Sequence, residues 1–183
     1  MNTTTTTRRF RRPVMAALAV AVAFTAAACV PPADPGPTTG ATLTTQDATT
    51  DVAPGTVITV EGKGYNPAAN IGTRPPLWNV PAGVYVIFAC VTDPWQPSAG
   101  GVGANRQVIQ QFWAVPGVEQ FNTIGGAGAG AILMDAEGSF TAELTLTDAP
   151  CAGRYAVITY AGSGAVANPG EELEIPVTFA QPV

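Results

Sequence analysis

The residues of this chain that could do chemistry are few, and its cysteines are the clearest of them. The 183-residue sequence contains three cysteines (Cys29, Cys90 and Cys151) and no histidine. Without histidine it lacks the usual general base for a serine or cysteine nucleophile and the commonest ligand of zinc and haem. The two later cysteines, with no CxxC spacing, leave a metal site short of ligands. The sequence therefore predicts a non-catalytic protein with no metal and no cofactor.

The serine and glutamate residues favour structural roles. Ser139 and Ser163 have no histidine to activate them as nucleophiles. Glu171, Glu172 and Glu174 form a small acidic group at the start of an expected strand, without the spaced oxygen ligands of a calcium loop. A charged strand edge that discourages aggregation fits this group better.

Residues 1–28 predict an export signal. Residues 1–12 carry four arginines and no acidic residue, residues 14–24 are uncharged and rich in Ala and Val, and three alanines precede Cys29. This is the pattern of a signal peptide, and the apolar run is far shorter than the roughly 20 residues of a membrane span. Because a cysteine directly after small residues resembles a lipobox, we expect Cys29 to be the lipidated first residue of a membrane-anchored lipoprotein. Plain secretion is the alternative, and the arginine pairs leave both the Sec and the twin-arginine route open.

Residues 29–40 follow as the anchor cysteine and a proline-rich tether. Proline favours extended polyproline II, so the segment is expected to hold residues 41–183 away from the membrane. Four of the eight basic residues lie before residue 29, and the other four face all 13 acidic residues, which gives the mature chain a net charge of −9. Such a chain, with no basic patch, is not expected to bind nucleic acid. The frequent use of Ala, Gly, Val, Thr, Pro and Arg suggests high-GC coding and an actinobacterial source.

Residues 41–183 show the alternation of half-buried strands. Phe140, Ala142, Leu144 and Leu146 fall on one face of residues 140–147, with threonine and glutamate on the other. No long 3.6-residue period occurs, so helix should be nearly absent. About seven strands separated by Gly and Pro turns predict an all-β, immunoglobulin-like antiparallel β-sandwich. These strands are expected around Leu43 and at residues 56–61, 84–91, 107–115, 140–147, 155–160 and 172–179.

Cys90 and Cys151 are expected to form a disulfide bond, the default for an even pair in an exported protein. In an immunoglobulin-like sandwich the strands 84–91 and 155–160 are antiparallel neighbours, which brings the end of the first close to the start of the second. The bond would then lie within one sheet, unlike the inter-sheet disulfide of antibody domains. Closing a loop of about 60 residues stabilises the fold by roughly 4 kcal/mol. Two buried free thiols are the alternative.

Five aromatic residues form the candidate surface for a ligand or partner. Aromatic side chains in or near irregular segments supply large contact areas. The alternative is that they only cover the ends of the sandwich and the long Gly- and Ala-rich excursion 93–130. These five residues are Trp78, Tyr85, Trp95, Phe112 and Trp113.

Four segments carry a family resemblance. Residues 54–67 (PGTVITVEGKGYNP) resemble the start of neocarzinostatin-like and other bacterial immunoglobulin-like domains, which share a strand followed by Gly-x-Gly-aromatic-x-Pro. Residues 83–100, 111–116 and 135–140 look similar to secreted actinobacterial modules of this kind. The resemblance implies an immunoglobulin-like fold, in modules that often accompany haem-transport-associated domains. Neocarzinostatin-like proteins carry an enediyne chromophore and have two disulfides, whereas only one cysteine pair is available here.

The predicted function is that of a lipid-anchored, non-catalytic binding or interaction module of the bacterial envelope. Its partners would be the membrane, through the lipid on Cys29, and an envelope protein or a small apolar ligand. The alternatives are a purely structural or accessory envelope domain, or a neocarzinostatin-like carrier of a small apolar molecule.

Overall fold

The strands of this chain form two stacked sheets. The computed structural model describes residues 40–181. The predicted signal peptide, the anchor Cys29 and the tether up to residue 39 lie outside the described residues. Within the described range the eight strands are β1 (Thr42–Thr45), β2 (Thr56–Lys63), β3 (Val84–Val91), β4 (Arg106–Pro116), β5 (Ala131–Met134), β6 (Phe140–Leu146), β7 (Arg154–Ala161) and β8 (Glu174–Val177).

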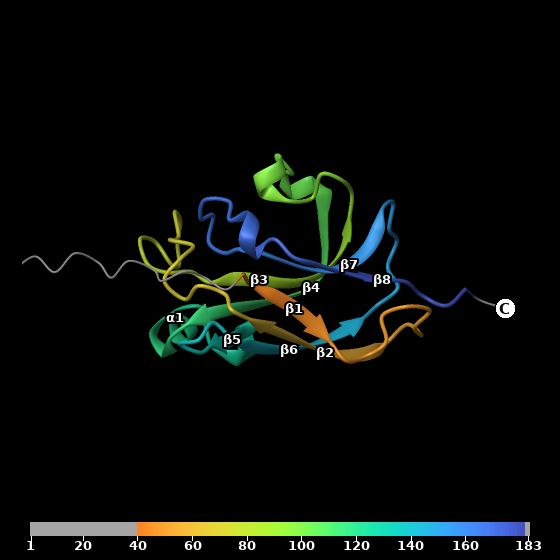
Figure 1. Ribbon diagram of the computed structural model, residues 1–183, viewed down its shortest axis with the longest axis horizontal. Helices are drawn as coiled ribbons and strands as arrows, with labels where there is room; N and C mark the ends of the chain where they lie inside the picture. The colour runs from red at the N-terminus through yellow and green to blue at the C-terminus, as the bar shows by residue number, and fades with distance from the viewer. Residues whose placement is uncertain (1–39, 182–183) are drawn as a thin grey trace, which may run out of the picture. The chain divides into compact units, whose positions relative to one another are not determined.

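One sheet has three strands and the other has five. Their orders are β1-β2-β6 and β5-β4-β3-β7-β8, and Figure 1 shows the two sheets packed face to face. Strand β3 pairs antiparallel with both β4 and β7. Its pairing with β7 is the neighbour relation expected of the third and sixth strands of an immunoglobulin-like fold. The predicted all-β sandwich is therefore confirmed.

The excursion 93–130 differs most from the expected elements. It is followed by β5, a strand that the alternation did not indicate and that pairs parallel with β4. Four residues are too few for a period of two to stand out, which explains why β5 was missed. One short α-helix, α1 (Val118–Thr123), lies between β4 and β5. The other helical segments within residues 40–181 are single 3-10 turns at Pro97–Ala99, Gly103–Asn105, Ala127–Ala129 and Pro169–Glu171.

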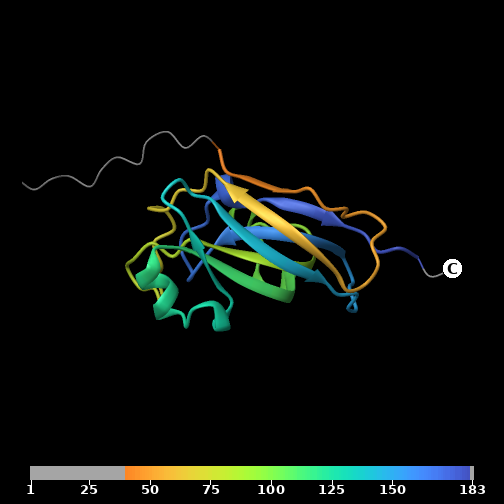
Figure 2. The same cartoon turned by 90° about the horizontal axis from the view of Figure 1, so that it is seen from below.

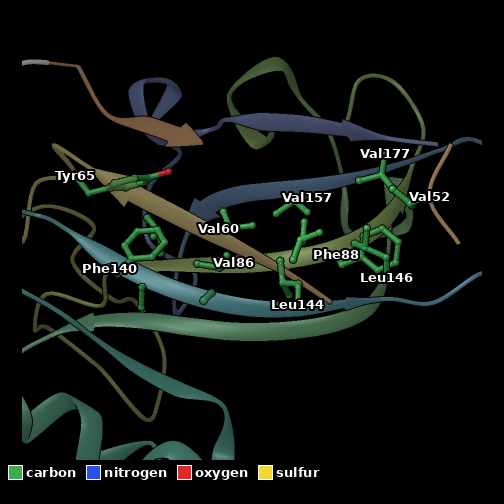
Figure 3. Packing of buried hydrophobic residues seen from close by; sticks show 14 of the residues in the cluster. Val52, Val60, Tyr65, Val86, Phe88, Phe140, Leu144, Leu146, Val157 and Val177 are labelled. Carbon is green, nitrogen blue, oxygen red and sulfur yellow. The ribbon is translucent and has the colours of Figure 1, made fainter. Parts of the chain in front are cut away.

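The main core lies between the two sheets. Alternate residues of β2 and β6 point inward, as the sequence predicts, and meet alternate residues of β3 and β7 (Figure 3). Val60, Val86, Leu144 and Val157 are fully buried at its centre. Full burial of each such side chain stabilises the fold by about 1.5–3 kcal/mol relative to exposure. Strand alternation therefore accounts for most of this core.

A second apolar layer covers the outer face of the five-stranded sheet. Ile87 of β3 and Ile158 of β7 point away from the main core, yet both are fully buried. Trp95, from the segment between β3 and β4, packs on them. In Figure 1 this segment (green) and the one between β7 and β8 (blue) stand on the sheet face opposite β1, β2 and β6. Trp95 thus covers the part of the outer face formed by Ile87 and Ile158, which is not an open interface.

The predicted disulfide is confirmed. Cys90, in β3, is bonded to Cys151, which lies in the segment before β7, and their Cα atoms are 5.5 Å apart. Cys90 is opposite Tyr155 in the β3–β7 register, so the bond joins neighbouring strands of the same sheet. A loop of this length contributes roughly 4 kcal/mol in the chain-entropy model.

Candidate functional site

The structure separates the five predicted aromatic residues into three environments. Tyr85 and Trp113 are cross-strand partners on the outer face of the five-stranded sheet, with ring centroids 4.9 Å apart. Trp78 lies in the loop before β3 and is 60% exposed. The remaining two point into apolar layers.

Two of the predicted surface aromatics pack into apolar layers. Trp95 is fully buried, and its indole Nε1 donates to Glu174 Oε2 at 2.6 Å. Phe112 packs against the main core, because on β4 it alternates with the outward-facing Trp113. The full burial of Trp95 contradicts its place on the predicted surface, whereas Phe112 is half-buried, like Tyr85 and Trp113. The neighbours of Trp95 in the sequence, Pro94 and Gln96, gave no sign of its burial.

The acidic group at the start of β8 also differs from the expected charged edge. Glu171 is 4% exposed, and its carboxylate accepts hydrogen bonds from the Asn66 amide at 2.8 Å and from Asn70 Nδ2 at 2.5 Å. Glu172 accepts from both the amide and the hydroxyl of Ser98. A buried carboxylate needs such donors, and here they come from distant parts of the chain.

Glu174 completes this arrangement by joining the outer layer to β7. Its carboxylate binds Trp95 and also accepts from Arg154, whose Nε lies 2.8 Å from Glu174 Oε1. The same guanidinium pairs with Asp93 at 2.7 Å. The hydrogen bond and charge of Arg154 hold the pKa of the Asp93 carboxyl below its usual range. The three glutamates therefore accept hydrogen bonds that hold two loops against the sheet.

A hollow in the described part of the chain lies where the two sheets open at the side of the sandwich. It has a volume of about 620 Å³, within the range of small-molecule and peptide sites. Figures 1 and 2 show α1 and β5 next to β6 at this end. We call this hollow the side cleft, and it is lined by Glu61, Gly62, Lys63, Gly117, Val118, Leu133, Met134, Asp135, Ser139, Phe140 and Thr141.

The side cleft has an apolar lining that remains open to solvent. Val118 is 61% exposed and Leu133 is 46% exposed, whereas Phe140 forms part of the buried floor. Large apolar side chains with this much exposure cost little singly, but gathered in one concavity they favour a ligand or partner. The lining is therefore suited to covering by another apolar group.

Charged groups form the rim of the side cleft. Lys63 Nζ lies 2.8 Å from Glu61 Oε2, and the hydrogen bond and charge of Glu61 raise the pKa of the lysine. Asp135 accepts hydrogen bonds from the amides of Glu137 and Ser139, which closes the turn into β6. Ser139 thus has a carboxylate neighbour that shapes the turn, in line with the structural role expected for this serine.

Two strand edges face each other across the side cleft. The amide of Trp113 donates a hydrogen bond to the carbonyl oxygen of Gly130. In a parallel ladder only every second residue of β5 then bonds to β4. The backbone N–H and C=O groups of Leu133 therefore point away from β4. On β6 the Thr145 amide donates to Gln110 Oε1 rather than to β2. The alternation of an antiparallel ladder then turns the backbone groups of Thr141 away from β2 as well.

Sequence reasoning missed the side cleft as a site. Only the DAEG turn at its rim was visible, and β5 and α1 have no periodicity that would have revealed them. No group of three or more Cys, Asp or Glu side chains placed to hold a metal ion occurs in residues 40–181. Over the same residues, the helices are all too short or too polar to cross a bilayer.

Comparison with known proteins adds no assignment. No family model matches the chain, and neither a curated protein nor a solved structure matches it. The resemblance to neocarzinostatin-like and other bacterial immunoglobulin-like modules thus stays a prediction based on the four segments named above. The side cleft and the outer face of the sheet are the features from which function can be inferred.

Proposed function

We propose that this chain is a non-catalytic interaction module of the bacterial envelope, held at the membrane by a lipid on Cys29, that binds an extended peptide segment of another envelope protein in the side cleft. Peptide binding in the side cleft is supported by two unpaired strand edges, at Leu133 and Thr141, that border the same partly apolar hollow. An extended peptide adds to such an edge through main-chain hydrogen bonds, while its side chains enter neighbouring pockets.

The openness of the side cleft favours a peptide over a small apolar molecule. A carrier usually encloses most of its ligand, whereas Val118 and Leu133 remain about half exposed at the mouth of this cleft. A peptide strand needs no enclosure, because it uses the strand edge on one side and remains solvated on the other. The small apolar ligand of a neocarzinostatin-like carrier is therefore the second candidate.

Selection from a library of random 12-residue peptides, followed by affinity measurement by fluorescence anisotropy on the full chain, tests this proposal. Leu133→Pro removes the one amide of β5 that points into the side cleft and keeps the bonds to β4. Val118→Asp places a charge on the apolar wall. We expect each substitution to lower the affinity for the selected peptides at least tenfold.

Val57→Asp is the matched control, because Val57 is 57% exposed and lies on β2 outside the side cleft. Its affinity for the same peptides should stay within twofold of the parent chain. Peptides that bind L133P and V118D as tightly as the parent would contradict the proposal. A bound mass lost on denaturation and absent from V118D would favour the small-molecule carrier instead.

The membrane anchor is tested separately by intact mass measurement. A diacylglyceryl-sized addition on a chain that begins at Cys29, recovered from a membrane fraction, is the expected result. Cys29→Ser should move the protein into the medium. An unmodified parent chain in the medium would favour plain secretion.

A further inference from the structure

Two of the four basic side chains in the described residues have no carboxylate partner. Lys63 pairs with one glutamate, and Arg154 pairs with two carboxylates. Arg74 and Arg106 form no salt bridge within residues 40–181, although acidic residues outnumber basic ones three to one in that range. A guanidinium without a carboxylate partner in the protein can pair with the carboxylate or phosphate of a ligand.

Arg106 lies against a row of three aromatic rings on the outer face of the five-stranded sheet. The Tyr85 ring lies between Trp113, at 4.9 Å, and Tyr160, at 5.4 Å, measured between centroids. The guanidinium carbon of Arg106 is 4.8 Å from the Tyr160 centroid, in cation–π contact. All three rings are only half-buried, so this part of the outer face reaches solvent.

Arg74 reaches the same place from the loop before β3. The amide of Ser163 donates to the Tyr85 hydroxyl at 3.1 Å, and the Ser163 hydroxyl donates to the Arg74 carbonyl oxygen at 2.7 Å. The Arg74 side chain lies along Gly164, where a Cβ would come within 3.2 Å of the Arg74 Nε. Glycine at that position therefore keeps the guanidinium close to the aromatic row.

The charges of both arginines act on the same phenol. Burial raises the pKa of Tyr160, and Arg106 and Arg74 each oppose that rise. The guanidinium of Arg106 lies over the Tyr160 ring, and Arg74 approaches the same row of rings from the loop before β3.

The guanidinium of Arg106 is only partly satisfied by the protein. Its Nη1 donates to the carbonyl oxygen of Trp95 and, at 3.4 Å, to that of Gly101. Its Nε is the one buried side-chain nitrogen or oxygen without a hydrogen-bond partner among the described residues. Leaving such a donor unpaired is costly. The Nε–Nη2 edge of a guanidinium is well shaped for two parallel hydrogen bonds to a carboxylate or phosphate.

We propose that Arg106 and Arg74, beside the aromatic row of Tyr85, Trp113 and Tyr160, form a binding site for an oxyanion, the carboxylate or phosphate group of a small ligand. This site is on the outer face of the five-stranded sheet and does not depend on peptide binding in the side cleft. The negative net charge of the domain disfavours a polyanion such as nucleic acid, so the ligand that fits carries a single oxyanion group.

Titration of the ¹⁵N-labelled full chain with inorganic phosphate, acetate and phenyl phosphate, followed through the arginine Nε–H resonances, tests the site. Sodium chloride at matched ionic strength is the reference titration. We expect the Nε resonances of Arg106 and Arg74 to shift saturably with at least one oxyanion. The resonance of Arg154 should stay in place, because its guanidinium is already paired with Asp93 and Glu174.

Substitution separates binding from structural effects. Arg74→Gln changes an exposed side chain and should weaken the apparent affinity at least fivefold, whereas Lys63→Gln should leave it within twofold. Arg106→Lys keeps the charge but loses the paired donors, so it should also weaken phosphate binding at least fivefold. Shifts that are linear in concentration, equal at Arg154, or reproduced by chloride would overturn the proposal, as would unchanged affinity in both arginine variants.

Discussion

The outer cover of the five-stranded sheet and the side cleft use the same residue types in opposite ways. In the outer cover, Trp95 is fully buried, and Glu172 and Glu174 bind donors from other segments. At the side cleft, Val118 and Leu133 are exposed, and the charged pair Lys63–Glu61 faces solvent. Apolar and charged groups stabilise the first region, and in the second they remain available to a partner.

This contrast shows why residue type alone does not identify a binding surface. Trp95 is an aromatic residue in an irregular segment, which favours a site by composition, yet here it packs a loop against the sheet. Nothing in the sequence marks Val118 and Leu133, the exposed apolar residues of the side cleft, as part of a site. Exposure depends on which segment packs over which face, so the comparison between the two regions is best tested by matched substitutions.

The largest expected effect on stability is the difference between substitutions of a buried and an exposed tryptophan. Trp95→Ala should lower the free energy of unfolding by about 4 kcal/mol, because it opens a cavity under the outer cover and leaves the Glu174 carboxylate without one donor. Trp78→Ala, at a 60% exposed position, should change it by less than about 0.5 kcal/mol. Chemical denaturation of both variants measures the difference. Equal losses would mean that the two regions do not differ as described.

A smaller effect is expected at the acidic residues. Glu174→Gln removes the charge that pairs with Arg154, whose hydrogen bonds reach a carboxylate that is only 19% exposed, and should cost about 2 kcal/mol. Glu61→Gln breaks an exposed ion pair and should cost less than about 1 kcal/mol. Thermal unfolding at neutral pH compares the two. A larger loss for E61Q would contradict the assignment of structural carboxylates to the outer cover.

The effect of acid on the free energy of unfolding, through Asp93 in the outer cover, should be smaller than these two effects. Because Arg154 depresses the pKa of Asp93, the Asp93 carboxylate contributes stability above its unfolded pKa, near 4, and this contribution is lost as the pH falls through the depressed value. Asp93→Asn should therefore be less stable than the parent chain at pH 7 and approach it below about pH 4. Denaturant unfolding across this range measures the convergence, and a constant difference at all pH values would refute it.

The smallest expected effect is on the stability of side-cleft variants. Val118→Asp should leave the unfolding free energy within about 0.5 kcal/mol of the parent, because the side chain is already solvated. Calorimetry of this variant is the check. A clear destabilisation would mean that Val118 packs as part of the core, which would remove the support for a free binding wall.

Much of the fold could be predicted because strand alternation is a local property. Phe140 to Leu146 alternate between inward apolar and outward polar side chains, and they form β6 as expected. β5 and α1 could not be predicted in the same way, since four and six residues are too short for a period to emerge and both form by packing beside β4. Of the candidate surface, Tyr85 and Trp113 lie together on the outer face and Trp95 is buried.

Covalent and local features of this protein are contained in the sequence: the pairing of Cys90 with Cys151 and the inward faces of the long strands. The tertiary structure alone decides what covers each face. It buries Trp95, gives Glu171 its amide donors, opens the side cleft between β5 and β6, and leaves Arg106 beside Tyr160 without a carboxylate. These outcomes depend on contacts between residues far apart in the chain, and alternation and composition carry no information about such contacts.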